Sequence, residues 1–360
     1  MASNVSESRE SPTSLFREFD RVDIVALTML DGFGPATVRK HVARIWSNRV
    51  PIDDGISRVA FGAAREMAER ALRTASRIDA RCILDCEAGF PQSLRDLRDP
   101  PVALWVLGNM SLMVDRPTVS IVGTRRCTMY GERVTREIAT GLSRAGAAVV
   151  SGMAVGIDAM AHRATLESGG VTVAVLGTGI DIPYPARHRA LHRQIRNHGV
   201  VLSEAGPGTP AMPGCFPKRN RLIAALSAAT VVVEAPVKSG SLLTADEAIA
   251  LGRTVAMVPG PIDSPQSVGS NEYMRDGAHV IASVADALAL VGLSKARPAD
   301  VRLESPNERA IWNSLDTPAA NFDVLCTRAG LPARLCFETV TVLELRGLVE
   351  CALTGEVRRR

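Results

Sequence analysis

The sequence predicts an α/β protein whose central part is a doubly wound parallel sheet. Short β-branched runs recur from residue 118 to residue 258, and amphipathic helical stretches fill the gaps between them. Strands that are apolar along their whole length are typical of a parallel sheet with helices on both faces. The composition is 46% hydrophobic and 22% charged, close to the average for folded globular chains. A length of 360 residues fits about two to three domains.

The first part of the chain predicts a tail followed by a helical module. Residues 1–15 are polar and rich in Ser, Glu and Arg, so we expect disorder there. Residues 16–88 show a helical pattern and predict an N-terminal module. Within it, residues 32–35 (Gly-Phe-Gly-Pro) predict a tight turn before a second helix. The turn is either an ordinary interhelical connection or, as in helix-hairpin-helix and SAM-like modules, a place where helix-start amides hold a phosphate.

Residues 89–292 predict the central α/β domain, which opens with a proline-marked connector at 91–108. The expected strands are 118–122, 147–150, 171–176, 200–202, 230–233 and 254–258. The expected helices between them are 132–144, 159–167, 186–197, 220–227 and 245–251.

The last part of the chain predicts a polar hinge at 294–298 and a small domain at 300–360. Two short helices are expected at 308–315 and 322–329, followed by a longer helix at 333–346 and a hairpin at 347–360. This order of elements is typical of a winged-helix domain.

Composition excludes several classes of protein. No apolar run approaches the ~18 residues that a membrane-spanning helix needs, and the N-terminus lacks the apolar core of a signal peptide. We therefore expect a cytoplasmic protein. The seven cysteines do not form C-x-x-C pairs, so we expect reduced thiols rather than a zinc site or a disulfide framework. The net charge of +4 is too small to indicate a nucleic-acid partner by itself.

Glycine-rich segments follow several of the predicted strands. Ligands bind beyond the carboxyl ends of the strands in open α/β sheets, and exposed amides before a helix favour an anion. The glycines of interest are Gly123 and Gly152, together with the Ser239-Gly240-Ser241 segment. Neither a Walker loop nor the dinucleotide fingerprint G-x-G-x-x-G is present, so no cofactor is predicted.

Basic residues gather beside these glycine segments. Residues 216–221 (FPKRNR) place Lys218, Arg219 and Arg221 at a helix start, where the helix dipole disfavours cations. Arg125 and Arg126 follow the first predicted strand. The arginine-rich stretch 187–196 is either a solvated face or a surface that steers a nucleic-acid backbone. Together these cations predict a groove that tracks a sugar–phosphate backbone.

The sequence shows no catalytic apparatus. Asp158 and His162 stand four apart on a predicted helix and share a face. They are open to two interpretations: a proton-transfer or metal-binding pair, or a helix cap with a packed histidine. No third ligand and no nucleophile elbow accompany them. We therefore expect no metal site.

The central domain closely resembles the DNA-processing protein A (DprA/Smf) family. The matching segments lie in order between residues 90 and 278: FPQSLRDLRDPP, IVGTRRCTMYG, SGMAVGIDAMAH, LGTGIDIPYP, FPKRNRLIAALS, VVVEAPVKSGSLLTADEA, GRTVAMVPG and GSNEYMRDGA. The resemblance implies a non-catalytic role and thus a protein that is not an enzyme. It implies a Rossmann-like domain that binds single-stranded DNA and forms a homodimer. It also implies a mediator that protects incoming DNA and loads the RecA recombinase during natural transformation.

The resemblance also implies site residues. The family's Gly-Ser-Arg phosphate loop falls on Gly123, Thr124 and Arg125, and its F-P-x-R-N-R motif falls on 216–221. The predicted DNA- and phosphate-binding residues are Gly123, Thr124, Arg125, Arg126, Gly152, Phe216, Lys218, Arg219, Asn220, Arg221, Ser239, Gly240 and Ser241. Phe216 is a base-stacking platform or a core anchor for its turn. His188 and Gly206 stand where the family usually has asparagine and proline.

Two other functions compete with this one. A nucleotide-processing hydrolase of the lysine-decarboxylase-like type shares a Rossmann-like fold, but its P-G-G-x-G-T-x-x-E loop has no counterpart at 236–244, which lacks paired glycines. The winged helix would alternatively make the chain a duplex-binding regulator. Its helix at 333–346 mixes two arginines with two glutamates, a poor footprint for the major groove, so protein interaction suits it equally well.

Overall fold

The computed structural model describes residues 14–293, 303–315, 317–352 and 355–359. The predicted hinge and most of the predicted tail lie outside these residues. The chain divides into two compact units, Met1–Ala296 and Arg297–Arg360.

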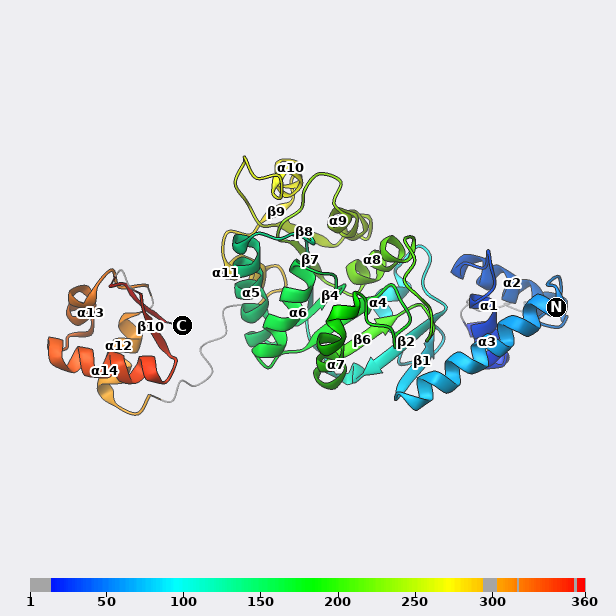
Figure 1. The fold of residues 1–360 in the computed structure, drawn as a ribbon, viewed down its shortest axis with the longest axis horizontal. Coiled ribbons are helices and arrows are strands. Elements are labelled where there is room, and N and C mark those ends of the chain that lie inside the picture. Colours follow the sequence, from blue (N-terminus) through cyan, green and yellow to red (C-terminus); the bar gives the residue numbers. More distant parts are fainter. Residues whose placement is uncertain (1–13, 294–302, 316, 353–354, 360) are drawn as a thin grey trace, which may run out of the picture. The chain divides into compact units, whose positions relative to one another are not determined.

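A nine-stranded sheet forms the centre of the first unit among the described residues (Figure 1). Its spatial order is β1 (Ala80–Leu84), β2 (Ala103–Gly108), β6 (Val200–Ser203), β5 (Thr172–Leu176), β4 (Ala148–Ser151), β3 (Thr118–Val122), β7 (Ala229–Val232), β8 (Thr254–Met257) and β9 (His279–Val280). The strands from β6 to β9 are parallel, whereas β2 pairs antiparallel with both β1 and β6.

The chain winds outward from β3 in both directions. Strands β4, β5 and β6 lie on one side of β3, and β7, β8 and β9 lie on the other. This is the doubly wound, Rossmann-like topology that the sequence predicts, and β3 and β7 form its switch point. All six predicted strands are present, with ends within one residue of those expected.

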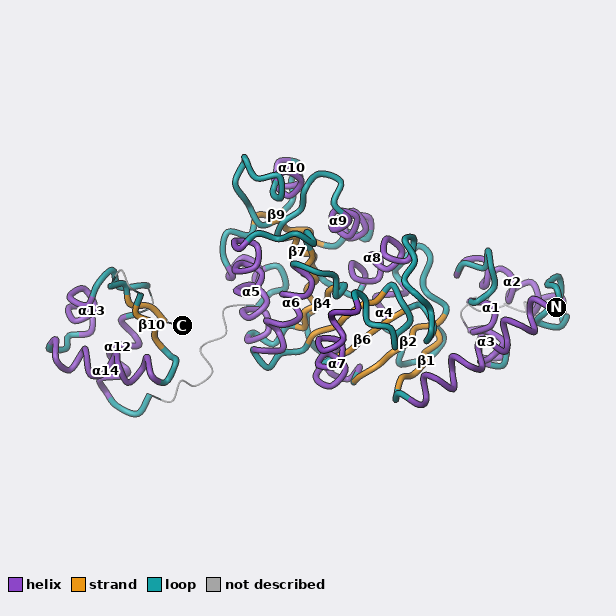
Figure 2. The backbone as a smooth tube through the Cα atoms, viewed as in Figure 1, coloured by secondary structure: helices purple, strands orange, loops and turns teal. Residues whose placement is uncertain are grey.

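Helices cover both faces of the sheet (Figure 2). Successive strand residues point to opposite faces, so Ile121 packs toward α5 and α6 while Val122 packs toward α8 and α9. The helices of this region are α4 (Gln92–Arg95), α5 (Met129–Arg144), α6 (Ile157–Glu167), α7 (Arg189–His198), α8 (Cys215–Ala225), α9 (Gly240–Ala250), α10 (Val268–Arg275) and α11 (Val284–Ala289), with 3-10 turns η2 (Met110–Met113) and η3 (Ala186–His188).

The N-terminal residues form three helices that pack beside β1 and β2. They are α1 (Arg21–Thr28), α2 (Pro35–Asn48) and α3 (Arg58–Arg77), preceded by the 3-10 turn η1 (Ser14–Glu18). Leu15 is buried in the shared core, although the sequence places it in the tail. The turn at Gly32 has φ +78°, and α2 begins at Pro35, as the sequence predicts.

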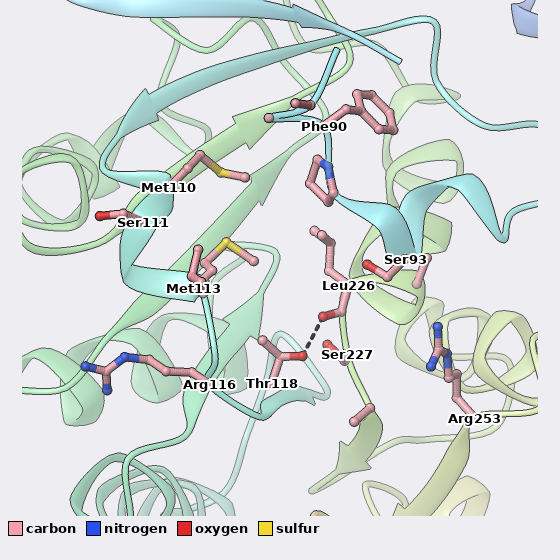
Figure 3. Close-up of a pocket in the computed structure, with 16 residues that line it drawn as sticks. Phe90, Ser93, Met110, Ser111, Met113, Arg116, Thr118, Leu226, Ser227 and Arg253 are labelled. Atoms are coloured by element: carbon pink, nitrogen blue, oxygen red, sulfur yellow. Dashed lines mark hydrogen bonds between the residues drawn. The ribbon is translucent and has the colours of Figure 1, made fainter. Parts of the chain in front are cut away.

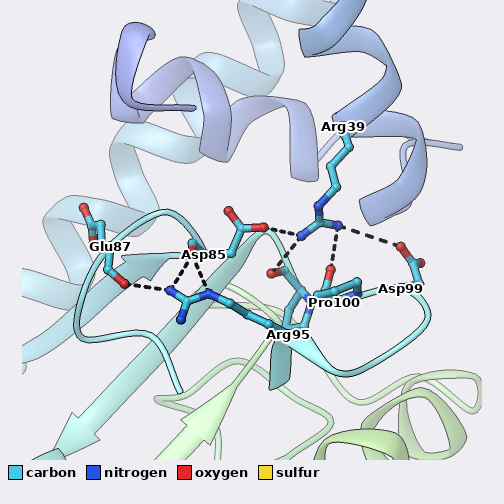
Figure 4. A network of polar contacts seen from close by, with 7 residues as sticks. Arg39, Asp85, Glu87, Arg95, Asp99 and Pro100 are labelled. Atoms are coloured by element: carbon cyan, nitrogen blue, oxygen red, sulfur yellow. Dashed lines mark hydrogen bonds and ion pairs between the residues drawn. The ribbon is translucent and has the colours of Figure 1, made fainter. Parts of the chain in front are cut away.

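Arginine side chains connect these helices to the sheet (Figure 4). Arg39 of α2 forms an ion pair with the buried Asp85 and donates to Pro100 O at 2.8 Å. Arg95 donates to Asp85 O at 2.7 Å and to Glu87 O at 3.0 Å. The loops at the ends of β1 and β2 are therefore held by two guanidinium groups, one of them from the helical module.

The second unit has the helix–helix–helix–hairpin order of a winged helix. Its elements are α12 (Pro306–Ser314), α13 (Phe322–Ala329), α14 (Ala333–Leu345), β10 (Val349–Cys351) and β11 (Val357–Arg359). Ile311, Leu325 and Leu343 meet in its own core, one from each helix. Within the described residues, no helix of either unit is long and apolar enough to span a bilayer.

Candidate functional site

A cleft opens at the carboxyl ends of β3, β4 and β7, where the strand order reverses. Its volume is about 490 Å³. It is lined by Val122, Gly123, Arg125, Ala154, Asp158, Pro213, Phe216, Pro217, Arg219, Asn220, Ile223, Ser239, Gly240, Ser241, Leu243 and Thr244. We call it the switch-point cleft. Eight of the thirteen predicted binding residues line it, namely Gly123, Arg125, Phe216, Arg219, Asn220, Ser239, Gly240 and Ser241.

Two of the predicted glycines allow close packing beneath this cleft. A Cβ at Gly123 would lie 2.6 Å from Ile157 Cγ1, and a Cβ at Gly152 would lie 2.0 Å from Arg219 Nη1. Both distances are shorter than a real Cβ tolerates. Glycine at these positions therefore lets α6 and α8 approach the ends of β3 and β4.

In the loop after β3, a buried and hydrogen-bonded threonine is followed by two exposed cations. Thr124 is buried, its amide donates to Glu234 O at 2.7 Å, and its hydroxyl donates to Gln266 Oε1 at 3.1 Å. The same hydroxyl accepts from the Arg126 amide at 3.2 Å. Thr124 thus shapes the loop, while the side chains of Arg125 and Arg126 are exposed. Only Arg125 lines the cleft.

An aromatic stack stands at the mouth of the cleft. The Arg125 guanidinium lies 5.8 Å from the centroid of the Phe216 ring, within the range of a cation–π contact. The Tyr184 ring lies 5.0 Å from Phe216 on a tilt of 35°, and Tyr184 is 42% exposed. The sequence reasoning missed Tyr184 as a site residue. Two features of the sequence could have pointed to it: Tyr184 is one of only three tyrosines, and it stands just beyond a glycine loop at the end of β5.

The three cations of the FPKRNR segment have three different environments. Lys218 is exposed to solvent. Arg219 is 6% exposed and donates through Nη1 to Val175 O. Arg221 forms an ion pair with Glu204, with Nη2 and Oε2 2.6 Å apart. The segment therefore does not present its three charges to the switch-point cleft, because Arg219 alone of the three lines it.

Arg219 forms the floor of the cleft rather than its rim. Burial lowers the pKa of Arg219 to about 10, and the charge of Asp158 opposes that shift. Burial likewise raises the pKa of Asp158, against the favourable charge of Arg219 and hydrogen bonds from two loop amides. Those amides belong to Gly152 and Ala154, 3.1 and 3.4 Å from Asp158 Oδ2. Asp158 therefore orders the loop after β4, while Arg219 is bonded to β5.

The segment before α9 closes the other side of the cleft. Ser239 caps α9 by accepting from the Ser241 amide, and the two hydroxyls lie 2.8 Å apart. Asn220 donates from Nδ2 to Gly240 O at 3.0 Å, which ties α8 to this segment. The predicted residues on α8 and before α9 are thus brought together, although Asn220 is buried and engaged by its own chain.

His162 is packed as the second interpretation expects, whereas Asp158 is not the cap of α6, whose N-cap is Gly156 without a side-chain cap bond. His162 Nδ1 lies 2.6 Å from Thr172 Oγ1, and the histidine is fully buried. Burial lowers the pKa of His162 to about 3, so the imidazole is neutral at physiological pH. Asp158 meanwhile accepts from the amides of its own loop. Among the described residues, no group of three His, Cys, Asp or Glu side chains is placed to hold a metal ion.

The arginine-rich stretch 187–196 presents cations outward and histidines inward. Arg187, Arg189 and Arg193 are exposed. His188 Nδ1 lies 2.9 Å from Met153 O, and His192 Nε2 lies 2.9 Å from Ile180 O. His188 therefore makes a hydrogen bond to the loop after β4 from the position where asparagine is usual in the resembled family.

A separate pocket of about 460 Å³ lies at the opposite edge of the sheet (Figure 3). It is bounded by Thr118, the first residue of β3, and by Leu226 beyond α8, which are joined by a 2.7 Å hydrogen bond. Methionines 110 and 113 give it an apolar wall. It lies away from the carboxyl ends of the strands and contains none of the predicted site residues.

Two family models match the sequence of this chain. The sequence model of a family described as DNA recombination-mediator protein A matches residues 81–292, and that of the DprA winged helix domain matches residues 295–352. A relative from Mycobacterium tuberculosis is 43% identical over 260 residues, which are 70% of this chain and 67% of the relative.

Two solved structures share the fold. The structure of DNA processing protein A from Streptococcus pneumoniae superposes with a TM-score of 0.67 at 32% identity, covering 75% of this chain and 98% of that one. The structure of DNA processing protein A from Helicobacter pylori, described for its single-stranded DNA binding mode, gives a TM-score of 0.53 at 30% identity over 58% of this chain and 94% of that one.

Proposed function

The chain belongs to the DNA recombination-mediator protein A family, and from that membership we propose that it binds single-stranded DNA at the switch-point cleft and delivers the strand to a recombinase. The observation that carries the proposal is the stack of Tyr184, Phe216 and Arg125 at the mouth of the cleft. A single strand exposes the faces of its bases, which stack on aromatic rings, whereas duplex bases are already stacked.

The surroundings of the stack supply contacts to the backbone. Arg125 and Arg126 are exposed on the loop after β3, and Lys218 is exposed on α8. Such cations bind phosphates without regard to sequence. The buried Arg219 and Asn220 shape the floor, so among the predicted residues Arg125, Arg126, Phe216 and Lys218 make the direct contacts in this proposal.

The finer parts of the proposal follow from the family. We propose that the protein is not an enzyme, acts as a homodimer in the cytoplasm, and loads RecA on incoming strands during natural transformation or recombination. The engagement of Asp158 and His162 with their own chain supports a binding role over a catalytic one.

Photo-cross-linking tests where the strand lies. A single-stranded oligonucleotide that carries 5-iododeoxyuridine is irradiated with the full chain, and the cross-linked peptides are identified by mass spectrometry. The proposal predicts cross-links to Tyr184 or Phe216. Cross-links confined to the winged helix, or to the pocket at the opposite edge of the sheet, would contradict it.

The mediator role has its own test. RecA is added to a single strand coated with single-strand-binding protein, and its DNA-dependent ATPase is followed with and without the chain. The proposal predicts a shorter lag with the chain present. An unchanged lag, despite tight DNA binding, would remove the mediator role and leave a binding protein.

A further inference from the structure

A second cleft lies on the other side of α8 from the switch-point cleft. Its volume is about 420 Å³, and it opens at the carboxyl ends of β5 and β6 beside the turn between α1 and α2. We call it the hairpin cleft, after the helical hairpin that α1 and α2 form. It is lined by Thr28, Phe33, Gly34, Pro35, Asp99, Val102, Ala103, Leu176, Gly177, Glu204, Ala205, Cys215, Lys218, Arg219, Arg221 and Leu222.

The hairpin cleft holds polar atoms that lack hydrogen-bond partners. Arg221 uses Nη2 for its ion pair with Glu204, and its buried Nη1 has no hydrogen-bond partner within the described part of the chain. The buried Oδ1 of Asp99 also has no hydrogen-bond partner there, although it forms a long ion pair with Arg39 Nη1 at 3.9 Å. Buried polar groups without partners cost free energy, and a ligand that pairs with them removes that cost.

These groups specify the chemistry of that ligand. Two carboxylates, from Glu204 and Asp99, accept hydrogen bonds, while Lys218 and Arg221 donate them. A phosphate alone would be repelled by the carboxylates. A planar group with both donors and acceptors on its edge suits the mixture. The apolar walls from Val102, Leu176 and Leu222, and the ring of Phe33, suit its flat faces.

Guanine fits this set of groups better than the other DNA bases. Its O6 and N7 accept from Lys or Arg, the commonest specific contact to a base. Its N1–H and N2–H are two adjacent donors, which a carboxylate accepts together. Thymine has a ring N–H but no exocyclic amino group, and adenine and cytosine have an amino group but no ring N–H beside it. None of the three therefore offers a carboxylate two adjacent donors.

We infer that the hairpin cleft is a base-reading subsite, which takes a guanine from a strand that crosses α8 out of the switch-point cleft. The inference rests on the proposed function. Arg219 lines both clefts, and Lys218 is exposed at the rim of the hairpin cleft, where it faces the backbone of such a strand. The N-terminal module thereby gains a role in sequence preference, because Phe33, Gly34 and Pro35 form one wall.

A competition experiment tests this inference. An all-thymine single strand and the same strand with one central guanine are titrated against the full chain by fluorescence anisotropy. The ratio of the two dissociation constants is then compared between variants. The wild-type chain is expected to bind the guanine strand about tenfold more tightly, the discrimination of one good bidentate pair.

Glu204→Gln and Asp99→Asn are each expected to bring the ratio toward one. Glu167→Gln is the matched control, because Glu167 is an exposed carboxylate paired with Arg136 on the surface, and it keeps the wild-type ratio. Equal binding of the two strands by the wild-type chain overturns the inference and leaves the proposed function standing. A preference that both variants retain also overturns it. Failure to bind either strand overturns the proposed function and the inference together.

Discussion

At the residue scale, charge and stacking at the switch-point cleft belong to different side chains. Arg125 is exposed and contacts the Phe216 ring with its guanidinium, and Phe216 in turn contacts Tyr184. An arginine contributes mainly through phosphates, in a way that salt weakens. A phenylalanine contributes through base faces, which salt affects little. The two contributions are therefore separable by experiment.

Replacement of Arg125 by alanine is expected to weaken binding to every single-stranded sequence about tenfold. The slope of log K against log salt should become shallower by about 0.7, the value for one phosphate contact on a single strand. Anisotropy titrations at four salt concentrations measure both quantities. Arg144→Ala is the control, because Arg144 is exposed at the far end of α5. An unchanged slope would show that Arg125 contacts no phosphate.

Replacement of Phe216 by alanine is expected to lower the affinity by about 1–3 kcal/mol, the contribution of one stacked base. The salt slope should stay as in the wild-type chain, and Phe216→Trp should retain tight binding because indole also stacks. The same titrations provide the data. If Phe216→Ala changes the salt slope, and Phe216→Trp binds as weakly as Phe216→Ala, the ring is an anchor for its turn and not a stacking platform.

His162 makes stability depend on pH. Its folded pKa of about 3 lies below the unfolded value of 6.5, so the unfolded chain binds the proton more readily. Above pH 6.5, His162 therefore does not lower the free energy of unfolding. Below pH 6.5 it lowers that free energy progressively as the pH falls toward 3. At pH 5 the loss is about 2 kcal/mol. Urea unfolding at pH 7.5 and pH 5 should show a smaller difference for His162→Asn than for wild type. Equal differences would contradict the assigned pKa.

The sequence contains a pattern that predicts the burial of Arg219, although the FPKRNR motif had indicated a binding cation there. Arg219, Leu222, Ile223 and Leu226 are spaced at i, i+3, i+4 and i+7, so they share one face of α8. Lys218 and Arg221 lie off that face. Helical periodicity alone therefore separates the buried arginine from its neighbours. The pairing of Arg221 with Glu204 could not be predicted, because it depends on how α8 sits against the end of β6.

At the element scale, the six strands that the sequence predicts are almost wholly buried, but burial does not separate them from the missed strands, because β2 is buried at five of its six positions. The short, exposed β9 was also missed. β1 and β2 were missed for local reasons. The Arg-Cys pair in β1 weakens its strand pattern, and Pro100 and Pro101 just before β2 indicated a connector. Both strands join the sheet antiparallel at its edge, where the helical module covers them. The covering helices come from a distant segment of the chain, so the local sequence of β1 and β2 does not indicate them.

Arg39 tests how the helical module is attached. Its partner Asp85 is buried, so Arg39→Ala leaves an unpaired buried carboxylate and should cost about 3–5 kcal/mol. We expect faster hydrogen exchange in α1 to α3 with little change in α5 and α6. Arg44→Ala, which breaks an exposed pair with Asp54, should cost less than about 1 kcal/mol.

A double variant, Arg39→Met with Asp85→Asn, controls for the unpaired buried carboxylate that Arg39→Ala leaves. It removes the carboxylate together with the guanidinium, so exchange in α1 to α3 should be slower than in Arg39→Ala alone. If Arg39→Ala leaves exchange in these helices unchanged, the apolar core holds the module without the ion pair.

At the scale of the whole molecule, the fold class and the order of its parts follow from the sequence. Periodicity and β-branched runs locate the doubly wound sheet, and the glycine segments locate the strand ends where the switch-point cleft opens. The second cleft could not be predicted, because it requires residues from α1 to α2, β2, β6 and α8 to meet. Sequence motifs report on single loops, whereas a cleft is assembled from several.

The winged helix has the surface of a protein-binding element. The exposed side chains of α14 include Leu335, Phe337, Val342 and Leu345, and Arg334 is paired with Glu338. An apolar helix with its cation neutralised suits a protein partner better than the phosphates of a duplex. This surface supports the part of the proposed function that places strand binding in the first unit.

The most direct test of single-strand binding is a titration of labelled single-stranded and double-stranded oligonucleotides with the full chain at two salt concentrations, without added nucleotide. We expect tight binding that prefers the single strand and weakens as salt rises. Absence of binding, or binding to duplex alone, would contradict the proposed function, because the aromatic stack and the exposed cations of the switch-point cleft would then have no strand to hold.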